Sequence, residues 1–260
     1  MKLLAAAGLV ALACGGAANR AAAGPSIPQA IRFRIAAVHP HDPNAFTQGL
    51  LVHEGRFFES TGHLGRSTLR EVEIESGRVV RSTPLPPDEF GEGLALVSGR
   101  LVQLTWQNGV AHGWDPKSFA RVAEWTYDGE GWGLAFDGRE LVQSDGSARL
   151  VFRSPETFAA VRTLDVKRAG APQFYLNELE WIDGAIWANV WQSDEILRID
   201  PASGEVTGVL DATGLLAPEE RRRADVLNGI AWDAAKRRLY VTGKNWPKLF
   251  ALELEVPAKP

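Results

Sequence analysis

One glutamate, one lysine and one asparagine are the residues of this chain best suited to chemistry. Glu92 lies in the phrase Phe90-Gly91-Glu92-Gly93. A carboxylate beside aromatic rings loses hydration, so its pKa rises toward the range useful for proton transfer. Lys244 and Asn177 can offer hydrogen bonds to an oxygen that gains negative charge. Two simpler interpretations stay open: Glu92 caps a backbone in a tight turn, and Lys244 is a surface lysine over an aromatic ring.

Aromatic and amide side chains recur near these three residues in the repeat described below. Aromatic walls with a few polar groups are the usual lining of a small-molecule pocket. The candidates for substrate contact are Phe46, Gln48, Phe90, Trp106, Gln107, Trp132 and Trp191. Trp181, Trp187 and Trp232 fall inside expected strands, so we expect them to pack within the fold.

Several other chemistries find no support in the sequence. The five histidines are scattered, without zinc-ligand spacing and without a Ser/His/Asp arrangement. The Gly-rich stretch 129–133 is not followed by a helical pattern, so it is not a phosphate loop. A net charge of −4 gives no electrostatic case for nucleic acid, and we expect Arg221-Arg222-Arg223 to form a solvated helix face. No metal ligand is therefore predicted, and the question of a structural metal stays open.

A five-fold repeat supplies the elements that must position these residues. Its phrases are Gln48-Gly49-Leu50, Glu92-Gly93-Leu94, Trp132-Gly133-Leu134, Asn177-Glu178-Leu179 and Asn228-Gly229-Ile230. Their central residues lie 40 to 51 positions apart, and a repeat of about 40 to 50 residues read as four short strands is typical of a propeller blade. We predict an all-β fold, a five-bladed β-propeller of four-stranded blades. The fifth repeat runs short, and the N-terminal strand 31–38 is expected to supply its outer strand and close the ring.

The hairpin geometry of the repeat gathers the candidate residues at one mouth of the ring. In an antiparallel hairpin the start of the first strand lies beside the end of the second. Strand starts then contribute Gln48, Glu92 and Asn177, and strand ends contribute Trp106 and others. The hairpin turns, such as Glu54-Gly55, point to the opposite mouth. We therefore expect the candidate residues to gather at one mouth of the ring, which we call the loaded mouth, and only ordinary hairpin turns at the other.

The first residues predict export. Lys2 precedes the apolar run 3–13, which is short for a bilayer span and fits the apolar region of an export signal. Residues 1–23 are interpreted as an export signal, 24–30 as a tether and 31–260 as a single propeller domain. The protein is expected to leave a bacterial cell and to reside in the periplasm or on the membrane.

Cys14 is the only cysteine of the chain. Its place directly after Ala11-Leu12-Ala13 resembles the lipidated cysteine of a bacterial lipoprotein, which would attach the protein to a membrane. The alternative is cleavage by the ordinary signal peptidase after Ala21-Ala22-Ala23. With one cysteine there is no intramolecular disulfide, so stability must come from the ring itself.

Eight ordered motifs together resemble the plant-type glutaminyl cyclases (glutaminyl-peptide cyclotransferases), which also occur in bacteria. They are Phe46-Thr47-Gln48-Gly49, Phe90-Gly91-Glu92-Gly93, Thr105-Trp106-Gln107, Gly131-Trp132-Gly133, Leu176-Asn177-Glu178-Leu179-Glu180, Trp187-Ala188-Asn189-Val190-Trp191, Leu227-Asn228-Gly229-Ile230-Ala231 and Thr242-Gly243-Lys244-Asn245-Trp246. The resemblance runs from about Phe33 to Leu254 and includes every position that the motifs define.

The resemblance implies a five-bladed propeller that converts an N-terminal glutamine of peptides or proteins to pyroglutamate and releases ammonia. It implies that Glu92 is the catalytic acid/base, that Asn177 and Lys244 hold or polarise the substrate, and that the aromatic set forms the pocket. This family is unrelated to the zinc-dependent animal cyclases, so no cofactor is expected for catalysis. We expect a monomer.

Two other functions fit the same mouth. A propeller can bind peptide N-termini or small ligands without reaction, but such a binder needs neither Glu92 nor Lys244. A calcium-dependent, lactonase-like hydrolase would use Glu92, Asn177 and Asn228 as oxygen ligands. Enzymes of that kind usually have six blades, whereas the repeat count here is five.

Overall fold

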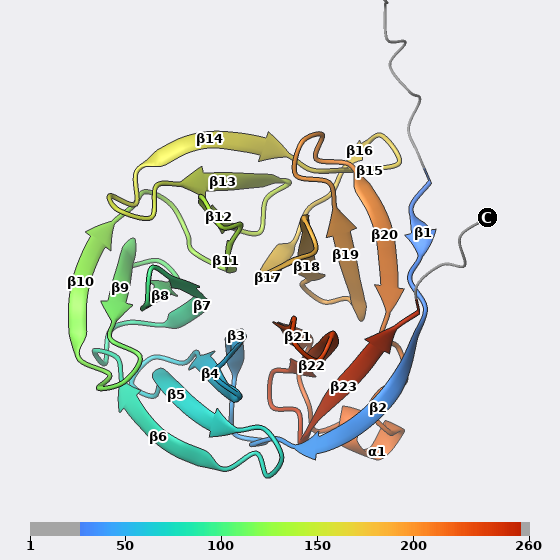
Figure 1. Ribbon diagram of the computed structural model, residues 1–260, viewed down its shortest axis with the longest axis horizontal. Helices are drawn as coiled ribbons and strands as arrows, with labels where there is room; N and C mark the ends of the chain where they lie inside the picture. Colours follow the sequence, from blue (N-terminus) through green and yellow to red (C-terminus); the bar gives the residue numbers. More distant parts are fainter. Residues whose placement is uncertain (1–26, 256–260) are drawn as a thin grey trace, which may run out of the picture.

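The computed structural model describes residues 27–255, and these form five antiparallel sheets arranged as blades around a central axis (Figure 1). Blade 1 consists of β3 (Thr47–His53), β4 (Arg56–Thr61), β5 (Thr68–Glu73) and β6 (Val79–Pro84). Blade 2 consists of β7 (Gly91–Val97), β8 (Arg100–Thr105), β9 (Val110–Trp114) and β10 (Arg121–Thr126). Blade 3 consists of β11 (Leu134–Phe136), β12 (Leu141–Gln143), β13 (Arg149–Arg153) and β14 (Ala160–Asp165). Blade 4 consists of β17 (Leu176–Ile182), β18 (Ala185–Val190), β19 (Glu195–Ile199) and β20 (Val206–Asp211). Blade 5 consists of β21 (Leu227–Asp233), β22 (Arg238–Gly243), β23 (Lys248–Leu254) and β2 (Phe33–Pro40). The prediction of a five-bladed propeller with four-stranded blades is confirmed.

Ring closure also follows the prediction. The N-terminal strand β2 pairs antiparallel with β23 and completes blade 5 from outside. The two shorter elements between blades are the hairpin of β15 (Lys167–Arg168) and β16 (Ala171–Pro172), which precedes blade 4, and the helix α1 (Pro218–Arg221), which precedes blade 5. The short helix carries the start of the arginine run, and it buries no residue, as expected for a solvated face.

The segment predicted as a tether is not free along its whole length. Gln29 and Ala30 form β1, which pairs in parallel with β20 at the outer edge of blade 4. The outer edge of a blade presents unpaired backbone groups, and a neighbouring extended segment can satisfy them. The proposed export signal, Cys14 and the first part of the tether lie outside the described residues. No helix within residues 27–255 is long and apolar enough to cross a membrane.

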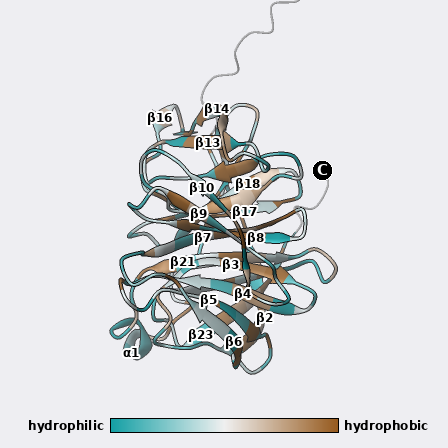
Figure 2. Ribbon diagram, turned by 90° about the vertical axis from the view of Figure 1, so that its left-hand side faces the viewer, coloured by the Kyte–Doolittle hydropathy of each residue, from teal (hydrophilic) through white to brown (hydrophobic). Residues whose placement is uncertain are grey.

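The core consists of five apolar clusters, one between each pair of neighbouring blades. Successive residues of an inner strand pack into the clusters on the two sides of their blade: Leu50 packs toward blade 5, and Leu51 packs toward blade 2. Strands that are buried on both faces are apolar without alternation, which explains the run Leu50-Leu51-Val52. Figure 2 shows this distribution, with hydrophobic segments concentrated in the strands and hydrophilic ones in the connecting loops.

The innermost strands approach one another closely around the axis, and glycine makes this possible. A Cβ on Gly49 would lie 2.5 Å from the Leu94 nitrogen, one on Gly93 would lie 2.5 Å from the Leu134 nitrogen, and one on Gly133 would lie 2.0 Å from the Asn177 oxygen. No side chain fits at such distances, so the glycines of the repeated phrase are required by blade-to-blade packing.

The fourth repeat has Glu178 where the others have glycine. Its buried carboxyl accepts hydrogen bonds from the backbone nitrogens of Leu50, at 3.3 Å, and Ile230, at 2.8 Å. These nitrogens belong to the inner strands of blades 1 and 5, so one side chain ties three blades together at the axis. Burial raises the pKa of the Glu178 carboxyl well above its ordinary value, and nearby Glu180 raises it further.

Four of the five inner strands carry a β-bulge at the same place. The register between the first two strands of a blade shifts at Gln48, Glu92, Asn177 and Asn228. A bulge places two residues of one strand opposite one residue of its partner and turns a side chain away from its ladder position. The bulge therefore repeats at the residues that the sequence assigns to the loaded mouth.

A buried ion pair joins the ring closure to the loop that carries Lys244. His41 Nδ1 donates to the Trp246 carbonyl at 2.7 Å, and His41 Nε2 donates to Glu59 Oε1 at 3.0 Å. Burial by itself would lower the pKa of His41, but Glu59 and the Trp246 carbonyl raise it. Burial would likewise raise the pKa of Glu59, but His41, Arg70 and Thr47 lower it.

These shifts predict a stability window between the ordinary pKa values of Glu59, 4.5, and His41, 6.5. The folded protein holds a proton on His41 more tightly than the unfolded chain does, so protonation of His41 stabilises the fold. This contribution is complete at pH values below 6.5 and is lost as pH rises through the raised pKa of the folded state. The folded protein keeps Glu59 ionised more readily than the unfolded chain does, so ionisation of Glu59 stabilises the fold. This contribution is complete at pH values above 4.5 and is lost as pH falls through the lowered pKa of the folded state. Urea unfolding should show that His41→Gln lowers the free energy of unfolding by about 3 kcal/mol at a pH inside the window.

The deficit of His41→Gln should shrink once the wild-type histidine is neutral, because the charged pair is then absent from both proteins. His53→Gln is the matched control, because the His53 side chain is 31% exposed and its nearest carboxylate, on Glu54, is 3.9 Å away. It should change stability by less than about 0.5 kcal/mol at either pH. A deficit of His41→Gln that does not vary with pH would contradict the assignment of a charged pair.

Candidate active site

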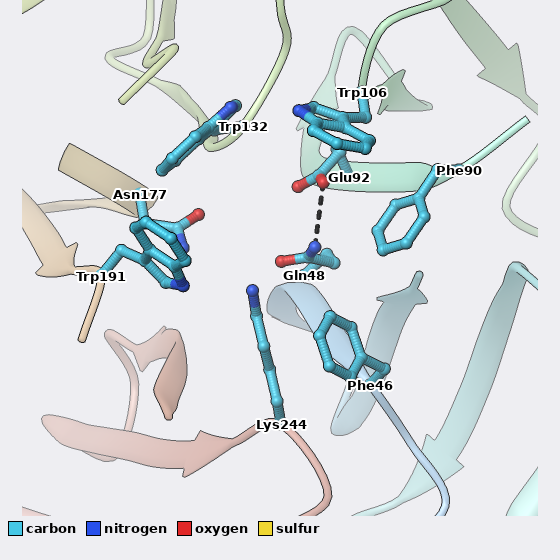
Figure 3. A pocket seen from close by; sticks show the side chains of 9 residues that line it. All are labelled: Phe46, Gln48, Phe90, Glu92, Trp106, Trp132, Asn177, Trp191 and Lys244. Atoms are coloured by element: carbon cyan, nitrogen blue, oxygen red, sulfur yellow. Dashed lines mark hydrogen bonds between the residues drawn. The ribbon is translucent and has the colours of Figure 1, made fainter. Parts of the chain in front are cut away.

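One mouth of the ring holds a pocket of about 360 Å³. Its lining is shown in Figure 3 and consists of Phe46, Gln48, Phe90, Glu92, Trp106, Trp132, Asn177, Trp191 and Lys244. All nine were candidates from the sequence, and they come from all five blades or from the segments leading into them. The tenth candidate, Gln107, does not line the pocket.

Glu92 lies at the bulge of β7 and is 4% exposed. Gln48 Nε2 donates to Glu92 Oε1 at 2.9 Å (Figure 3). Burial raises the pKa of the Glu92 carboxyl well above its ordinary value; Lys244 opposes this rise, and the Glu130 carboxylate adds to it. The direction of this shift agrees with the expectation from the sequence that a carboxyl beside aromatic rings has a raised pKa.

Asn228 orients the Gln48 amide. Its Nδ2 donates to Gln48 Oε1 at 3.2 Å and to the Thr47 carbonyl at 3.0 Å. With its oxygen occupied in this way, the Gln48 amide presents its nitrogen to Glu92. The sequence places Asn228 at the mouth without assigning this role, because the contact joins blades 5 and 1 and only the folded ring brings them together.

Lys244 follows β22 in a loop that is held on both sides. Its backbone nitrogen donates to the Val226 carbonyl at 2.9 Å, and its carbonyl accepts from the Asp225 nitrogen at 2.8 Å. The side chain is 5% exposed, and its Nζ lies 4.7 Å from the centre of the Phe46 ring. Burial lowers the pKa of Lys244, and Glu92 and Asp225 oppose this. Lys244 is thus a buried cation in the pocket and not the surface lysine of the simpler interpretation.

Asn177 occupies the bulge of β17, and Figure 3 shows its amide pointing into the pocket. Its backbone carbonyl accepts from Ser144 Oγ at 2.6 Å, which anchors it to blade 3. Its Oδ1 is buried and has no hydrogen-bond partner within residues 27–255.

Aromatic rings form a collar around these polar groups. Phe46 meets Phe90 edge-on with ring centres 6.0 Å apart, and Phe90 meets Trp106 at 5.8 Å. On the other side, Trp132 meets Trp191 at 5.8 Å. Edge-to-face packing of this kind fixes ring orientation. The collar therefore presents preformed apolar walls around the glutamate, the lysine and the asparagine.

Glu130 joins the two sides of the collar. Its Oε2 accepts from Trp106 Nε1 at 2.7 Å and from Trp132 Nε1 at 2.9 Å, and its Oε1 accepts from Gln107 Nε2 at 2.9 Å. Burial would raise the pKa of Glu130, but these hydrogen bonds lower it, so the group stays ionised. Gln107, predicted to contact substrate, instead holds Glu130, because its side chain turns along the rim and not inward.

The structure separates the predicted packing tryptophans from the pocket. Trp187 is 3% exposed and belongs to the cluster between blades 4 and 5, and Trp181 and Trp232 pack against the interblade clusters as expected. Glu180 and Trp232 line a smaller pocket among residues at the other end of the inner strands. Among residues 27–255, no group of three or more His, Cys, Asp or Glu side chains is arranged to hold a metal ion.

Comparisons with known proteins agree in pointing to one family. A family model described as glutamine cyclotransferase matches residues 6–254. A glutaminyl-peptide cyclotransferase of Arabidopsis thaliana is 42% identical over 228 residues, which are 86% of this chain and 71% of that protein. The crystal structure of Myxococcus xanthus glutaminyl cyclase is similar with a TM-score of 0.81 and 43% identity, and the match covers 89% of this chain and 100% of that one.

Proposed function

Because the chain belongs to the glutamine cyclotransferase family, we propose that its pocket folds an N-terminal glutamine into a ring with Glu92, Lys244 and Asn177 as the catalytic groups. The activity is that of a glutaminyl-peptide cyclotransferase, which converts the N-terminal glutamine of a peptide or protein to pyroglutamate and releases ammonia. One observation supports the assignment of roles above the others: a buried carboxyl with a raised pKa shares an aromatic pocket with a buried lysine. A non-catalytic binder needs neither group, and family membership also decides against the lactonase-like alternative.

The first task of such an enzyme is conformational. The α-amine of the substrate must meet the side-chain carbonyl of the same residue, and a free glutamine rarely adopts that bent shape. Aromatic walls on both sides, from Phe46 and Phe90 to Trp132 and Trp191, confine the aliphatic part of the side chain. Confinement in a reactive geometry removes most of the entropic part of the barrier.

Glu92 is then placed to move the proton. The amine nitrogen attacks the side-chain carbonyl carbon and forms the ring C–N bond. Glu92 in its ionised form takes a proton from that nitrogen and delivers it to the departing nitrogen, so the C–N bond of the original amide breaks with release of ammonia. Glu92 ends as it began. No covalent bond to the protein is needed, which agrees with the lack of a nucleophilic triad in the sequence.

Lys244 and Asn177 act on the oxygen. As the amine attacks, the carbonyl oxygen becomes an oxyanion, and the ammonium of Lys244 and the amide nitrogen of Asn177 donate to it. Interactions that strengthen as charge develops lower the barrier instead of merely tightening substrate binding. Both groups are buried, so water competes little with these hydrogen bonds.

Glu92→Gln tests the acid/base assignment. The amide fits the same space but transfers no proton, so kcat for a Gln-initiated peptide should fall by about 10²- to 10⁴-fold. Ammonia release and the loss of 17 Da, roughly one ammonia, by mass spectrometry measure the reaction. Wild-type turnover should be the same with and without a chelator, since these roles use no metal.

Glu180→Gln is the matched control for this experiment. Burial raises the pKa of Glu180 to about 8, yet the residue lines the pocket at the opposite end of the inner strands. Turnover by Glu180→Gln should stay near wild type. Near wild-type turnover by Glu92→Gln would remove Glu92 from its role, and loss of activity with chelator would overturn the metal-free assignment.

The opposite shifts of Glu92 and Lys244 predict a bell-shaped pH profile of kcat. Activity should rise as pH passes the raised pKa of Glu92, because the base must be ionised. It should fall as pH passes the lowered pKa of Lys244, because the donor must be protonated. Lys244→Arg keeps the charge with a far higher pKa, so the alkaline limb should move to higher pH even though kcat drops. An alkaline limb at an unchanged pH would show that Lys244 does not set it.

We also propose that the protein is exported and is anchored through a lipid on Cys14. The support is the sequence pattern of residues 1–23, with one cysteine after a short apolar run. Bacteria that express the chain should incorporate radiolabelled palmitate into it and retain it in the membrane fraction, and Cys14→Ser should abolish both. A mature protein that begins after Ala23, without label, would support ordinary signal cleavage instead.

A further inference from the structure

A second cavity lies on the same face of the propeller as the catalytic pocket. It measures about 370 Å³ and sits between two connections of blade 3. One connection joins β12 to β13, and the other runs from the end of β14 through the β15–β16 hairpin to the start of β17 (Figure 1). Its walls include Asp145, Ala148, Arg149, Val166, Pro172 and Phe174. We call this space the Phe174 cavity.

The Phe174 cavity and the catalytic pocket share no lining residue, but neighbouring residues of the chain connect them. The Trp132 indole lies directly over Gly146, where an added Cβ would come within 2.7 Å of the ring, and Gly146 directly follows the cavity residue Asp145. The Gly146 carbonyl accepts from the Tyr175 nitrogen at 2.7 Å, and the Tyr175 carbonyl accepts from the Trp191 nitrogen at 2.8 Å. The same short segments thus support both spaces.

An exposed aromatic path leads from one space to the other. Trp191 lines the catalytic pocket, its ring centre lies 5.9 Å from that of Tyr175, and Phe174, which lines the second cavity, directly precedes Tyr175 in the chain. The exposed fractions of Trp191, Tyr175 and Phe174 are 36%, 53% and 53%. Large apolar side chains that gather in one exposed patch usually mark a binding surface.

The path is held in place by the backbone. Tyr175 has a φ of 65°, in the left-handed region that bulky residues rarely adopt. Backbone strain of this kind persists only where surrounding contacts impose it, and it gathers at functional sites. Here the contacts are the backbone hydrogen bonds from Tyr175 to Gly146 and from Trp191 to Tyr175, so the backbone that carries these aromatic residues is held in place.

The geometry of the reaction indicates what would follow this path. This step rests on the proposed function: the amine and side chain of the N-terminal glutamine react inside the pocket, so the rest of the peptide must leave across the rim. In an extended chain, side chains alternate between two faces at about 3.3 Å per residue. The third side chain therefore faces the protein again about 7 Å beyond the first, and a chain that leaves on the Trp191 side of the rim passes the residues around Tyr175 and the Phe174 cavity.

We propose that the Phe174 cavity is the subsite for the third residue of the substrate peptide and that it takes an apolar or aromatic side chain. Val166, Pro172 and Phe174 supply its apolar wall. Asp145, Lys167, Arg149 and Asp165 also line it, and of these Arg149 and Asp165 pair with each other at 2.9 Å. The second residue of the peptide faces solvent and contributes little to selection.

Three amidated peptides test the subsite: Gln-Ala, Gln-Ala-Ala-Ala and Gln-Ala-Phe-Ala. For the wild-type protein, kcat/KM for the phenylalanine tetrapeptide should exceed that for the alanine tetrapeptide by roughly tenfold, the discrimination typical of an apolar pocket. Phe174→Ala should reduce this ratio to within about twofold of unity, and Ala148→Trp, which fills the cavity, should do the same. Neither change should alter the rate with the dipeptide by more than about threefold, a change too small to reflect a lost pocket contact.

Val161→Ala is the matched control, since Val161 is an exposed apolar residue on the outer strand β14 of the same blade. It should leave all three rates and the ratio unchanged. A ratio that survives both Phe174→Ala and Ala148→Trp would overturn the subsite, as would an equal loss on all three peptides. If the wild-type protein turns over none of the three peptides, the proposed function itself is overturned. If it turns over all three at equal kcat/KM, the proposed function stands and only the subsite is overturned.

Discussion

The close approach of five inner strands around one axis is the constraint on which the rest of the structure depends. Gly49, Gly93 and Gly133 are needed because neighbouring backbone lies within 2.5 Å of where their Cβ would be. Glu178 breaks the pattern and ties the backbones of blades 1 and 5 to blade 4. Because the strands meet this tightly, the residues just before the glycines converge on a single small volume. The pocket is thus a direct consequence of how the ring packs.

The same crowding explains the chemistry of the pocket. A bulge at Gln48, Glu92, Asn177 and Asn228 turns side chains out of their ladders toward the axis, where aromatic rings exclude water. Burial then raises the pKa of Glu92 and lowers that of Lys244. Each of the two groups opposes the shift of the other's pKa. Glu130 holds the ring of tryptophans and adds negative charge without entering the pocket.

Closure of the ring and function are connected at blade 5. This blade takes its outer strand from the N-terminal end of the described chain and its inner hairpin from the C-terminal end. The loop that carries Lys244 follows that hairpin and is bonded to the segment before blade 1 through His41 and Asn245. Lys244 is therefore positioned by contacts that lie beside the strand pairing that closes the ring. The arrangement of this side of the pocket depends on a closed ring.

The sequence by itself determined the number of blades, the four-stranded hairpin order and all nine residues that line the pocket, whereas its tenth candidate, Gln107, does not line it. It could do so because repeat length and strand alternation are local, and because antiparallel hairpins dictate which strand ends share a mouth. Only the tertiary structure decided that Gln107 supports Glu130, that Asn228 orients Gln48 and that a second cavity adjoins the first. These features arise between blades or along the rim, where distances depend on how the sheets pack. A glycine follows the polar residue at three of the four bulges, those of Gln48, Glu92 and Asn228, but the bulges themselves were not evident from the sequence because they depend on how the inner strands pair.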